Sequence, residues 1–253
     1  MAGAGVGPLF TLWDRTRGRQ NVRGVASLGN FPYYLISNDP RIKTLDDFGP
    51  RDRIAVPAVG VSGAVALAAA CLGAALGRAR LQPPGTRSRW PCPHPDAAAA
   101  IIRGGTEITA HFASPPFQEQ ELARNPKAHI VLDSYAIEGG PTSATVLYAT
   151  EKFRRDNPRT YQAFVAALAE AAVFVQRQPE QAADLFVRRN GGKIDRALVL
   201  RILKDPKVQF KTAPQNTLKL GQFLSPDRRD QAGADLGQGL FLRQRASRRR
   251  QLR

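Results

Sequence analysis

Small hydroxyl and amide side chains recur beside glycine or proline at points where an apolar run gives way to a turn. These groups are Ser27-Leu28-Gly29-Asn30, Gly60-Val61-Ser62, Ser114-Pro115-Pro116 and Thr142-Ser143. Hydroxyl and amide groups donate hydrogen bonds, and glycine allows a close approach to the backbone. At strand ends and helix N-termini this combination is typical of sites that bind small anions. Each group can equally be an ordinary turn or helix cap.

The histidines do not form a recognisable metal or catalytic pattern. His94, His111 and His129 are scattered, and only His111 has an acidic neighbour on the same face of a predicted strand, Glu107. A metal site needs a third ligand that the sequence does not supply, so we predict that His111 is structural. The sequence also lacks a nucleophile elbow, a P-loop and a GxGxxG motif. We therefore predict a binding protein without metal or cofactor, and not an enzyme.

Alternating strands and helices are predicted to position these residues. Apolar and β-branched runs predict strands at Val22–Leu28, Tyr33–Ser37, Arg53–Pro57, Glu107–Phe112, His129–Asp133 and Ser143–Tyr148. Helices are predicted at Leu45–Phe48, with Thr44 as its cap, and at Asp96–Arg103 and Phe117–Arg124. This alternation is typical of a parallel α/β sheet, which we expect the third, fourth and fifth of these strands to share.

The pattern changes to helices after Thr150. An apolar stripe with helical spacing follows a helix start at Pro158, and it consists of Tyr161, Phe164, Val165, Leu168, Ala172 and Val175. Further helices are predicted at Pro179–Arg189 and Asp195–Leu203. Val208–Phe210 fits a short strand or an extended connector. We expect Thr150–Leu203 to be helical throughout.

Two stretches differ from the rest in composition. Gly63–Pro93 and Ser225–Arg253 are rich in Ala, Gly, Arg and Pro, the residues of GC-rich codons. Back-translated with GC-biased codons and read in a shifted frame, Ser225–Phe241 yields RRIGATKPAPTWGKDYF and Gly85–Pro93 yields NPLTVAMP, both of which resemble ordinary protein. We infer two shifted reading frames. Because neither stretch offers an apolar surface shaped for this fold, we expect both to be poorly ordered or poorly packed.

The formal net charge of +16 is concentrated in these two stretches, which carry more than half of the excess. A strongly basic chain ordinarily indicates nucleic acid or an anionic membrane. No basic segment is interleaved with stacking aromatics, so we expect no nucleic-acid partner. Both cysteines, Cys71 and Cys92, also lie in the first stretch, where an accidental origin is the simplest reading. The remaining chain has no cysteine, which fits an oxidising compartment.

Four blocks, in order, resemble a known protein family. They are GVASLGNFPYYLISNDPRIKTLDDF, RIAVPAVGVS, PHPDAAAAIIRGGTEITAHFASPPF and GPTSATVLYATEKFRRDNPRTYQAFVAALAEAAVFVQRQPEQAADLF. Together they resemble the periplasmic substrate-binding proteins of ABC importers, of the nitrate/sulfonate/taurine or thiamine-pyrimidine-precursor-like type. The resemblance covers roughly residues 5–224, interrupted at 63–93. It implies an α/β, two-lobed fold of the type II periplasmic-binding-protein kind, here with an incomplete first lobe.

The resemblance also implies a function and a site. A small anionic or aromatic solute would lie between the lobes, an ABC permease would be the membrane partner, and the protein would be a monomer. The residues that match the solute contacts are Gly7, Ser27, Gly29, Asn30, Gly60, Val61, Ser62, Ser114, Pro115, Thr142 and Ser143. Two alternatives stay open. One is an enzyme of thiamine-precursor synthesis on the same fold, whose cysteine-rich motif this chain lacks. The other is a chain whose shifted segments prevent function.

The resemblance finally implies a division of the chain. Residues 1–50 belong to the first lobe, 51–140 to the second, and 141–224 return to the first as mainly helical chain, with 225–253 as a tail. Family members are periplasmic. Residues 1–8 lack the basic start and apolar run of a secretion signal, and we expect the beginning of the first lobe to be absent.

Overall fold

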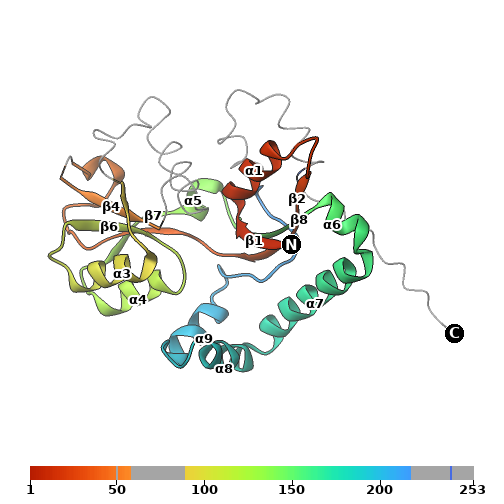
Figure 1. Ribbon diagram of the computed structural model, residues 1–253. Coiled ribbons are helices and arrows are strands. Elements are labelled where there is room, and N and C mark those ends of the chain that lie inside the picture. Colours follow the sequence, from red (N-terminus) through yellow and green to blue (C-terminus); the bar gives the residue numbers. More distant parts are fainter. Residues whose placement is uncertain (50, 58–88, 218–239, 241–253) are drawn as a thin grey trace.

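The computed structural model describes residues 1–49, 51–57, 89–217 and 240. Figure 1 shows its elements, which follow one another as β1 (Ala2–Gly5), α1 (Val6–Arg15), β2 (Val22–Asn30), β3 (Tyr34–Ser37), a 3-10 turn (Leu45–Asp47), β4 (Arg53–Val56), β5 (Arg89–Pro91), α3 (His94–Arg103), β6 (Ile108–Ala113), α4 (Phe117–Arg124), β7 (His129–Asp133), α5 (Ser134–Glu138), β8 (Ser143–Thr150), α6 (Glu151–Asp156), α7 (Pro158–Arg177), α8 (Pro179–Arg189) and α9 (Arg196–Lys204).

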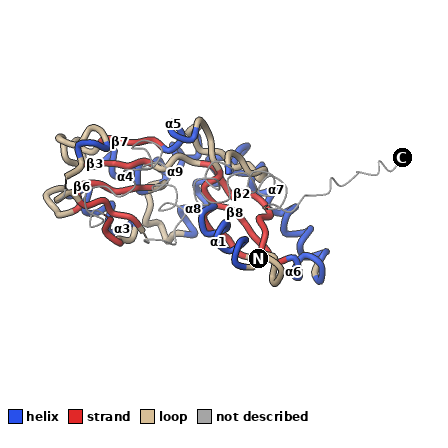
Figure 2. The backbone as a smooth tube through the Cα atoms, turned by 90° about the horizontal axis from the view of Figure 1, so that it is seen from above, coloured by secondary structure: helices blue, strands red, loops and turns tan. Residues whose placement is uncertain are grey.

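The strands form two sheets that lie side by side along the long axis of the molecule, as both Figure 1 and Figure 2 show. The first sheet has three strands in the order β1-β8-β2, and the second has five in the order β5-β4-β6-β3-β7. Helices pack on both sheets, so the protein is a two-lobed α/β fold. The strands β4, β6 and β7 share the second sheet, which confirms the sequence-based prediction.

The three strands predicted to share a sheet run in the same direction, but the sheet as a whole is mixed. Strand β4 runs parallel to β5 and β6, but β3 is antiparallel to both of its neighbours, β6 and β7. The reason is the path of the chain, because β3 enters directly from β2 of the other sheet, whereas β6 and β7 are reached through the helices α3 and α4. Strand β3 thus belongs to the second sheet.

Alternating side chains of the strands divide the core between the faces of each sheet. In the three-stranded sheet, Val22 and Val146 pack with Leu9 and Phe10 of α1, whereas Val25 and Leu147 face Tyr161 of α7. In the five-stranded sheet, Leu35 and Phe112 extend the first of these clusters, and Ile36 packs on Ile101 of α3. Figure 1 shows α1 and α7 on opposite sides of the three-stranded sheet.

The segment after Thr150 is helical, as predicted, and its helix starts have clear local causes. The Thr150 hydroxyl accepts from the backbone N–H of Phe153 at 3.1 Å, and the Asp195 carboxylate accepts from Ala197 at 3.0 Å. Pro158 and Pro179 occupy first-turn positions, where proline needs no hydrogen-bond partner. The apolar stripe is only partly covered, because Tyr161, Val165 and Leu168 pack against the three-stranded sheet whereas Phe164 remains 43% exposed.

Parts of the two compositionally unusual stretches are packed, which corrects the prediction for those residues. Arg89–Pro91 forms β5 beside β4, and the free thiol of Cys92 is buried next to Ala55 and Ala97. Leu240 is buried in the largest core cluster, and its carbonyl accepts from Gly24 at 2.7 Å. Apolar side chains pack wherever they meet a complementary surface. Cys71 and the rest of both stretches lie outside the described residues.

The helices of the described part of the chain were compared with the length and apolarity that a membrane span requires. Among residues 1–49, 51–57 and 89–217, none of the helices is both long and apolar enough to cross a bilayer.

Candidate functional site

Parallel strands bring two polar residues to one edge of the five-stranded sheet: Ser114, which was predicted as a site residue, and His94, which was not. Strands β4, β5 and β6 run in the same direction, so their carboxyl ends meet at the same edge. His94 follows β5 and begins α3, and Ser114 follows β6 directly. In open α/β sheets, ligands bind outside the carboxyl ends of such strands. Pro115 also lies here, joined to Pro116 by a cis peptide bond.

The facing edge of the three-stranded sheet carries most of the other predicted residues. Strand β2 ends at Asn30, and the antiparallel strand β8 begins opposite it at Ser143. Strand β1 also ends here, since Gly5 pairs with Thr145, and α1 therefore begins at this edge with Gly7 in its first turn. The predicted residues Ser27, Gly29 and Thr142 lie beside them and are buried.

Three stretches of chain connect the two edges. Phe31–Tyr33 joins β2 to β3, residues 134–142 join β7 to β8, and residues 205–215 return from α9 to the first sheet. The first connection is so short that Asn30 and Tyr34 lie within about 15 Å of each other. Since Tyr34 pairs with Ala113, the neighbour of Ser114, the two polar edges face one another across these connections.

Asn30 is the centre of a buried hydrogen-bond network, which we call the Asn30 network and which consists of Ser27, Asn30, Ser143 and Gln215. The side-chain oxygen of Asn30 accepts from the Ser27 hydroxyl at 3.2 Å and from the Ser143 hydroxyl at 3.0 Å. Its amide nitrogen donates to the Gln215 side chain at 2.5 Å. Asn30, Ser27 and Ser143 are all at most 2% exposed. The structure thus brings together three of the residues predicted to contact a solute, and adds Gln215 to them.

The Asn30 network leaves little hydrogen-bonding capacity for a ligand. The backbone of Asn30 forms both bonds of an isolated bridge with Gln209, each at 2.8 Å, and Ser143 Oγ accepts from the Gln215 N–H at 2.9 Å. A Cβ at Gly29 would lie 3.8 Å from the Gln209 carbonyl oxygen, which is an ordinary van der Waals contact, so the packing here does not require glycine. Thr142 is occupied as well, since its hydroxyl donates to the Gly140 carbonyl at 3.3 Å.

The first turn of α1 also lies at this edge. Its N-cap is Gly5, so no side chain caps the helix, and the first turn contains no acidic residue. The first N–H groups of a helix have no partner within the helix, and the helix dipole is positive at this end. These donors favour an anion close to Gly7.

The opposite edge contains a chain of three hydrogen bonds that the sequence did not predict, which we call the Glu121 relay. It comprises Glu121, His111, His94 and Ser114. Glu121 Oε1 lies 2.5 Å from His111 Nδ1, and His111 Nε2 lies 2.8 Å from His94 Nδ1. His94 Nε2 lies 3.4 Å from Ser114 Oγ. His94 also stacks on Phe117 with 5.4 Å between ring centroids, which fixes the plane of its ring.

Burial sets the charge of the Glu121 relay. Glu121 and His111 are completely buried, whereas His94 and Ser114 are partly exposed. Burial raises the pKa of Glu121 to about 8 and lowers the pKa of His111 to about 3. Burial, with a smaller contribution from His111, lowers the pKa of His94 to about 4. Near neutral pH the single proton between Glu121 and His111 therefore stays on the carboxyl, and all four side chains are uncharged.

The sequence analysis missed this relay for a simple reason. His111 and Glu121 are ten residues apart across a turn, and His94 enters from a third element, so no spacing rule links them. The pairing of His111 with Glu107 that strand periodicity offered is wrong, because Glu107 is 73% exposed and pairs with Arg53 at 3.4 Å. The predicted structural role of His111 accords with its full burial.

The described residues contain no arrangement of three or more His, Cys, Asp or Glu side chains that could hold a metal ion. His129 lies elsewhere, with its two ring nitrogens 2.9 and 2.6 Å from the carbonyls of Lys127 and Ile42. The predicted residues Gly60, Val61 and Ser62 lie outside the described part of the chain.

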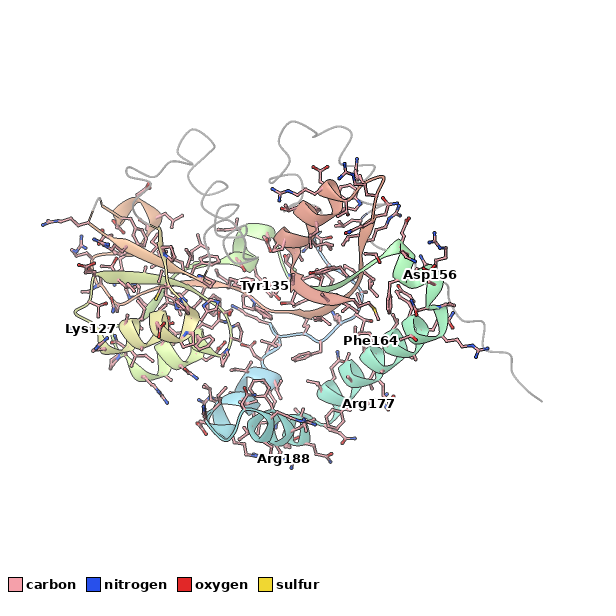
Figure 3. All side chains as sticks on the ribbon, in the orientation of Figure 1. Lys127, Tyr135, Asp156, Phe164, Arg177 and Arg188 are labelled. Carbon is pink, nitrogen blue, oxygen red and sulfur yellow. The ribbon has the colours of Figure 1, made fainter. Side chains whose placement is uncertain are left out.

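Lys207 links the returning connection to the edge of the five-stranded sheet. Its ammonium group lies 3.0 Å from Asp133 Oδ2 and 3.3 Å from the Tyr34 hydroxyl, and its carbonyl accepts from the Tyr135 hydroxyl at 3.1 Å. Figure 3 labels Tyr135 near the middle of the molecule, between the two lobes. Burial raises the pKa of Tyr34, and the bond from Lys207 partly opposes this increase.

Comparisons with known proteins identify the fold. No family model matches the chain, and no curated protein matches it. Among solved structures, the periplasmic aliphatic sulphonate binding protein SsuA from Escherichia coli is 18% identical, with a TM-score of 0.65, over 99% of this chain and 78% of that one. A protein from Bordetella bronchiseptica RB50 is 24% identical, with a TM-score of 0.66, over 89% and 72%.

The chain has the periplasmic binding protein fold. This fold was predicted from the four sequence blocks, and the solved structures confirm it. The fold also occurs in an enzyme, because the desulfurization enzyme DszB matches 90% of this chain and 79% of its own, with 16% identity and a TM-score of 0.58. The shared fold therefore does not decide what this protein does.

Proposed function

We propose that this protein is the solute-binding component of an ABC importer for a small anionic solute of the sulfonate class. The observation that carries the proposal is that hydrogen-bond donors face each other from two lobes. The uncapped first turn of α1 lies on one edge, and the Ser114 hydroxyl lies on the other, where His94 contacts it from inside. A tetrahedral or planar oxyanion accepts several hydrogen bonds at once, so donors from both sides suit it.

The fold supports the same proposal. Binding proteins of this architecture work by closure of the lobes on the solute, and no bond is made or broken. The partner would be a membrane permease that recognises the closed form, and the place of work would be the periplasm, as for the SsuA proteins. A thiamine-precursor enzyme is the weaker alternative, since the cysteine-rich motif expected for it is missing.

Isothermal calorimetry of the full chain tests the proposal. We expect ethanesulfonate and benzenesulfonate to bind, and the uncharged ethyl methyl sulfone to fail. The Ser62→Ala, Ser114→Ala double variant should bind at least about tenfold more weakly, because each hydroxyl lost removes a hydrogen bond to a charged group. Thr106→Val is the matched control, because Thr106 precedes β6 at the opposite edge of the sheet. Undiminished binding in the double variant would contradict the assignment.

The enzyme alternative has its own readout. Proton NMR of ethanesulfonate after prolonged incubation with the protein should show the solute unchanged. Release of sulfite or a carbon product would favour a reaction of the kind carried out on this fold by a desulfurization enzyme.

A further inference from the structure

The Glu121 relay leads from a completely buried carboxyl to a partly exposed hydroxyl. Glu121 and His111 have no exposed surface, and the last bond of the chain ends at Ser114, on the edge where the proposed solute lies. His94, His111 and Glu121 are not among the residues that the sequence predicted to contact a solute. A line of hydrogen bonds that ends at a binding edge can set which way its terminal hydroxyl points.

Hydrogen-bond chemistry allows the relay only two arrangements. A neutral imidazole donates through one nitrogen and accepts through the other, so each bond fixes the next. With Glu121 protonated, its O–H donates to His111 Nδ1, His111 Nε2 donates to His94 Nδ1, and His94 Nε2 donates to Ser114 Oγ. The Ser114 proton is then free for an outside acceptor. With Glu121 ionised, all three bonds reverse, and Ser114 donates inward to His94.

The second carboxyl oxygen of Glu121 selects the first arrangement. Glu121 Oε2 is buried and has no hydrogen-bond partner among the described residues. An ionised carboxylate with one oxygen unsolvated is far more costly to bury than a neutral carboxyl. On the same helix, Gln118 Oε1 and Glu119 Oε2 are also buried without a partner among the described residues, and the Gln118 amide donates to Glu119.

We propose that Glu121, His111 and His94 are positioning residues that turn the Ser114 hydroxyl outward as a donor to the oxyanion group of the solute, and that ionisation of Glu121 reverses them. The inference rests on the proposed function, and it adds that the protonation state of Glu121 determines whether Ser114 can bind an anion. With Glu121 protonated, Ser114 offers a proton and suits a fully ionised sulfonate. In the reversed arrangement Ser114 presents only lone pairs, which repel the same anion.

Other titratable groups surround the relay. Glu119 lies on the same helix, Asp96 on α3, Tyr34 on β3, Cys92 directly before α3, and Asp205 and Lys207 after α9. Burial raises the pKa of Glu119, and the charges of Asp205 and Glu121 add to this increase. Burial also raises the pKa of Cys92, with a smaller contribution from Asp96. The pKa of Glu121 itself is raised by burial.

Nitrogen-15 NMR of the histidine rings tests the relay without any solute. In the wild type, we expect His94 to carry its proton on Nε2 at about pH 6 and on Nδ1 at about pH 10, on either side of the Glu121 pKa of about 8. In Glu121→Gln, which has no titrating proton, both rings should keep one tautomer at both pH values. An unchanged tautomer in the wild type, or the same change in Glu121→Gln, would overturn the relay.

Calorimetry with ethanesulfonate, whose charge is constant over this range, tests the role in binding. We expect wild-type affinity to fall about tenfold between the two pH values, Glu121→Gln to show no such fall, and Ser114→Ala to bind weakly at both. Glu119→Gln is the matched control, since it removes a neighbouring half-buried carboxyl outside the relay and should keep the fall in affinity.

The outcomes separate the two claims. A pH-dependent tautomer with no ethanesulfonate binding at either pH would overturn both the sulfonate function and the donor role of Ser114, while leaving the hydrogen-bond order intact. Binding with an equal fall in wild type and Glu121→Gln would overturn the inference and leave the proposed function standing.

Discussion

The Asn30 network and the Glu121 relay stand on facing edges of the two lobes, and both are buried polar clusters at strand ends. They differ in how completely their groups are used. Asn30 has a partner for its side-chain oxygen, its side-chain nitrogen and both backbone groups. The relay keeps one carboxyl oxygen without a partner among the described residues and ends at a partly exposed hydroxyl.

This difference indicates that the Asn30 network stabilises the fold, whereas the Glu121 relay can take part in binding a solute. A fully bonded buried network gains nothing from a ligand and fixes one arrangement of the chain. A cluster with unused capacity at its outer end can pass a hydrogen bond to something outside. Position at a strand end, which was the only criterion available in the sequence, does not distinguish the two. The predictions below break or sharpen this contrast.

The largest effect is expected from removing the centre of the Asn30 network. Asn30→Ala leaves the hydroxyls of Ser27 and Ser143 and the Gln215 side chain without their partner, so we expect a loss of about 3 kcal/mol in the free energy of unfolding. Urea denaturation measures it. Ser27→Ala, which removes one of two donors to the same oxygen, should cost about 1 kcal/mol. Equal losses in both variants would show that Asn30 is not the centre.

The relay should instead appear in the pH dependence of stability. Glu121 has a folded-state pKa of about 8 against an ordinary 4.5, so the folded protein holds a proton that the unfolded chain has lost, and stability falls as pH rises between those values. His111 and His94 have folded pKa values of about 3 and 4 against 6.5, so stability falls as pH drops below 6.5. The cluster therefore favours a maximum near pH 6.5.

Above pH 6.5, Glu121 is the member of the relay whose protonation still differs between the folded and the unfolded protein. One proton is worth about 1.4 kcal/mol per pH unit, so the wild type should lose about 2 kcal/mol between pH 6.5 and 8 from this group. Thermal unfolding across pH should show this decline disappear in Glu121→Gln and persist in Asn30→Ala. A decline of the same size in Glu121→Gln would mean that another group causes it.

The smallest effect is expected at the exposed connection. Lys207→Met keeps the apolar stem but removes the ion pair with Asp133, which should cost less than about 1 kcal/mol and become smaller in concentrated salt. Asp133→Ala should cost more, because its other oxygen accepts from the Tyr135 N–H at 2.9 Å and caps α5. Chemical denaturation at two salt concentrations compares them, and a larger loss in Lys207→Met would reverse their expected order.

Local sequence signals predicted much of the fold. Runs such as His129–Asp133 and the proline starts of α7 and α8 carry their own information, and the structure confirms each of them. The direction of β3 could not be predicted in this way, because it depends on the route of the chain from the other sheet. Helix α1 was missed because its first turn contains glycine and proline, which the sequence indicates as a loop.

The residues of the candidate site also fall into those that local sequence signals could identify and those that they could not. Ser27, Asn30 and Ser143 were found because each lies next to a turn signal, although their saturation with partners could not be seen in the sequence. His94, His111 and Glu121 were not grouped because α3, β6 and α4 meet only in the folded protein. Sequence shows which residues end strands, and packing decides which of them touch.

The three connections between the lobes have a mechanical consequence. They are cross-linked side by side, since Asn30 pairs with Gln209, Tyr33 exchanges hydrogen bonds with Ser134, and Ser143 bonds to Gln215. A flat strip of cross-linked chains bends readily about one axis but resists torsion. We therefore expect the lobes to move with one degree of freedom, so that Ser114 and the first turn of α1 meet in the same alignment each time they come together.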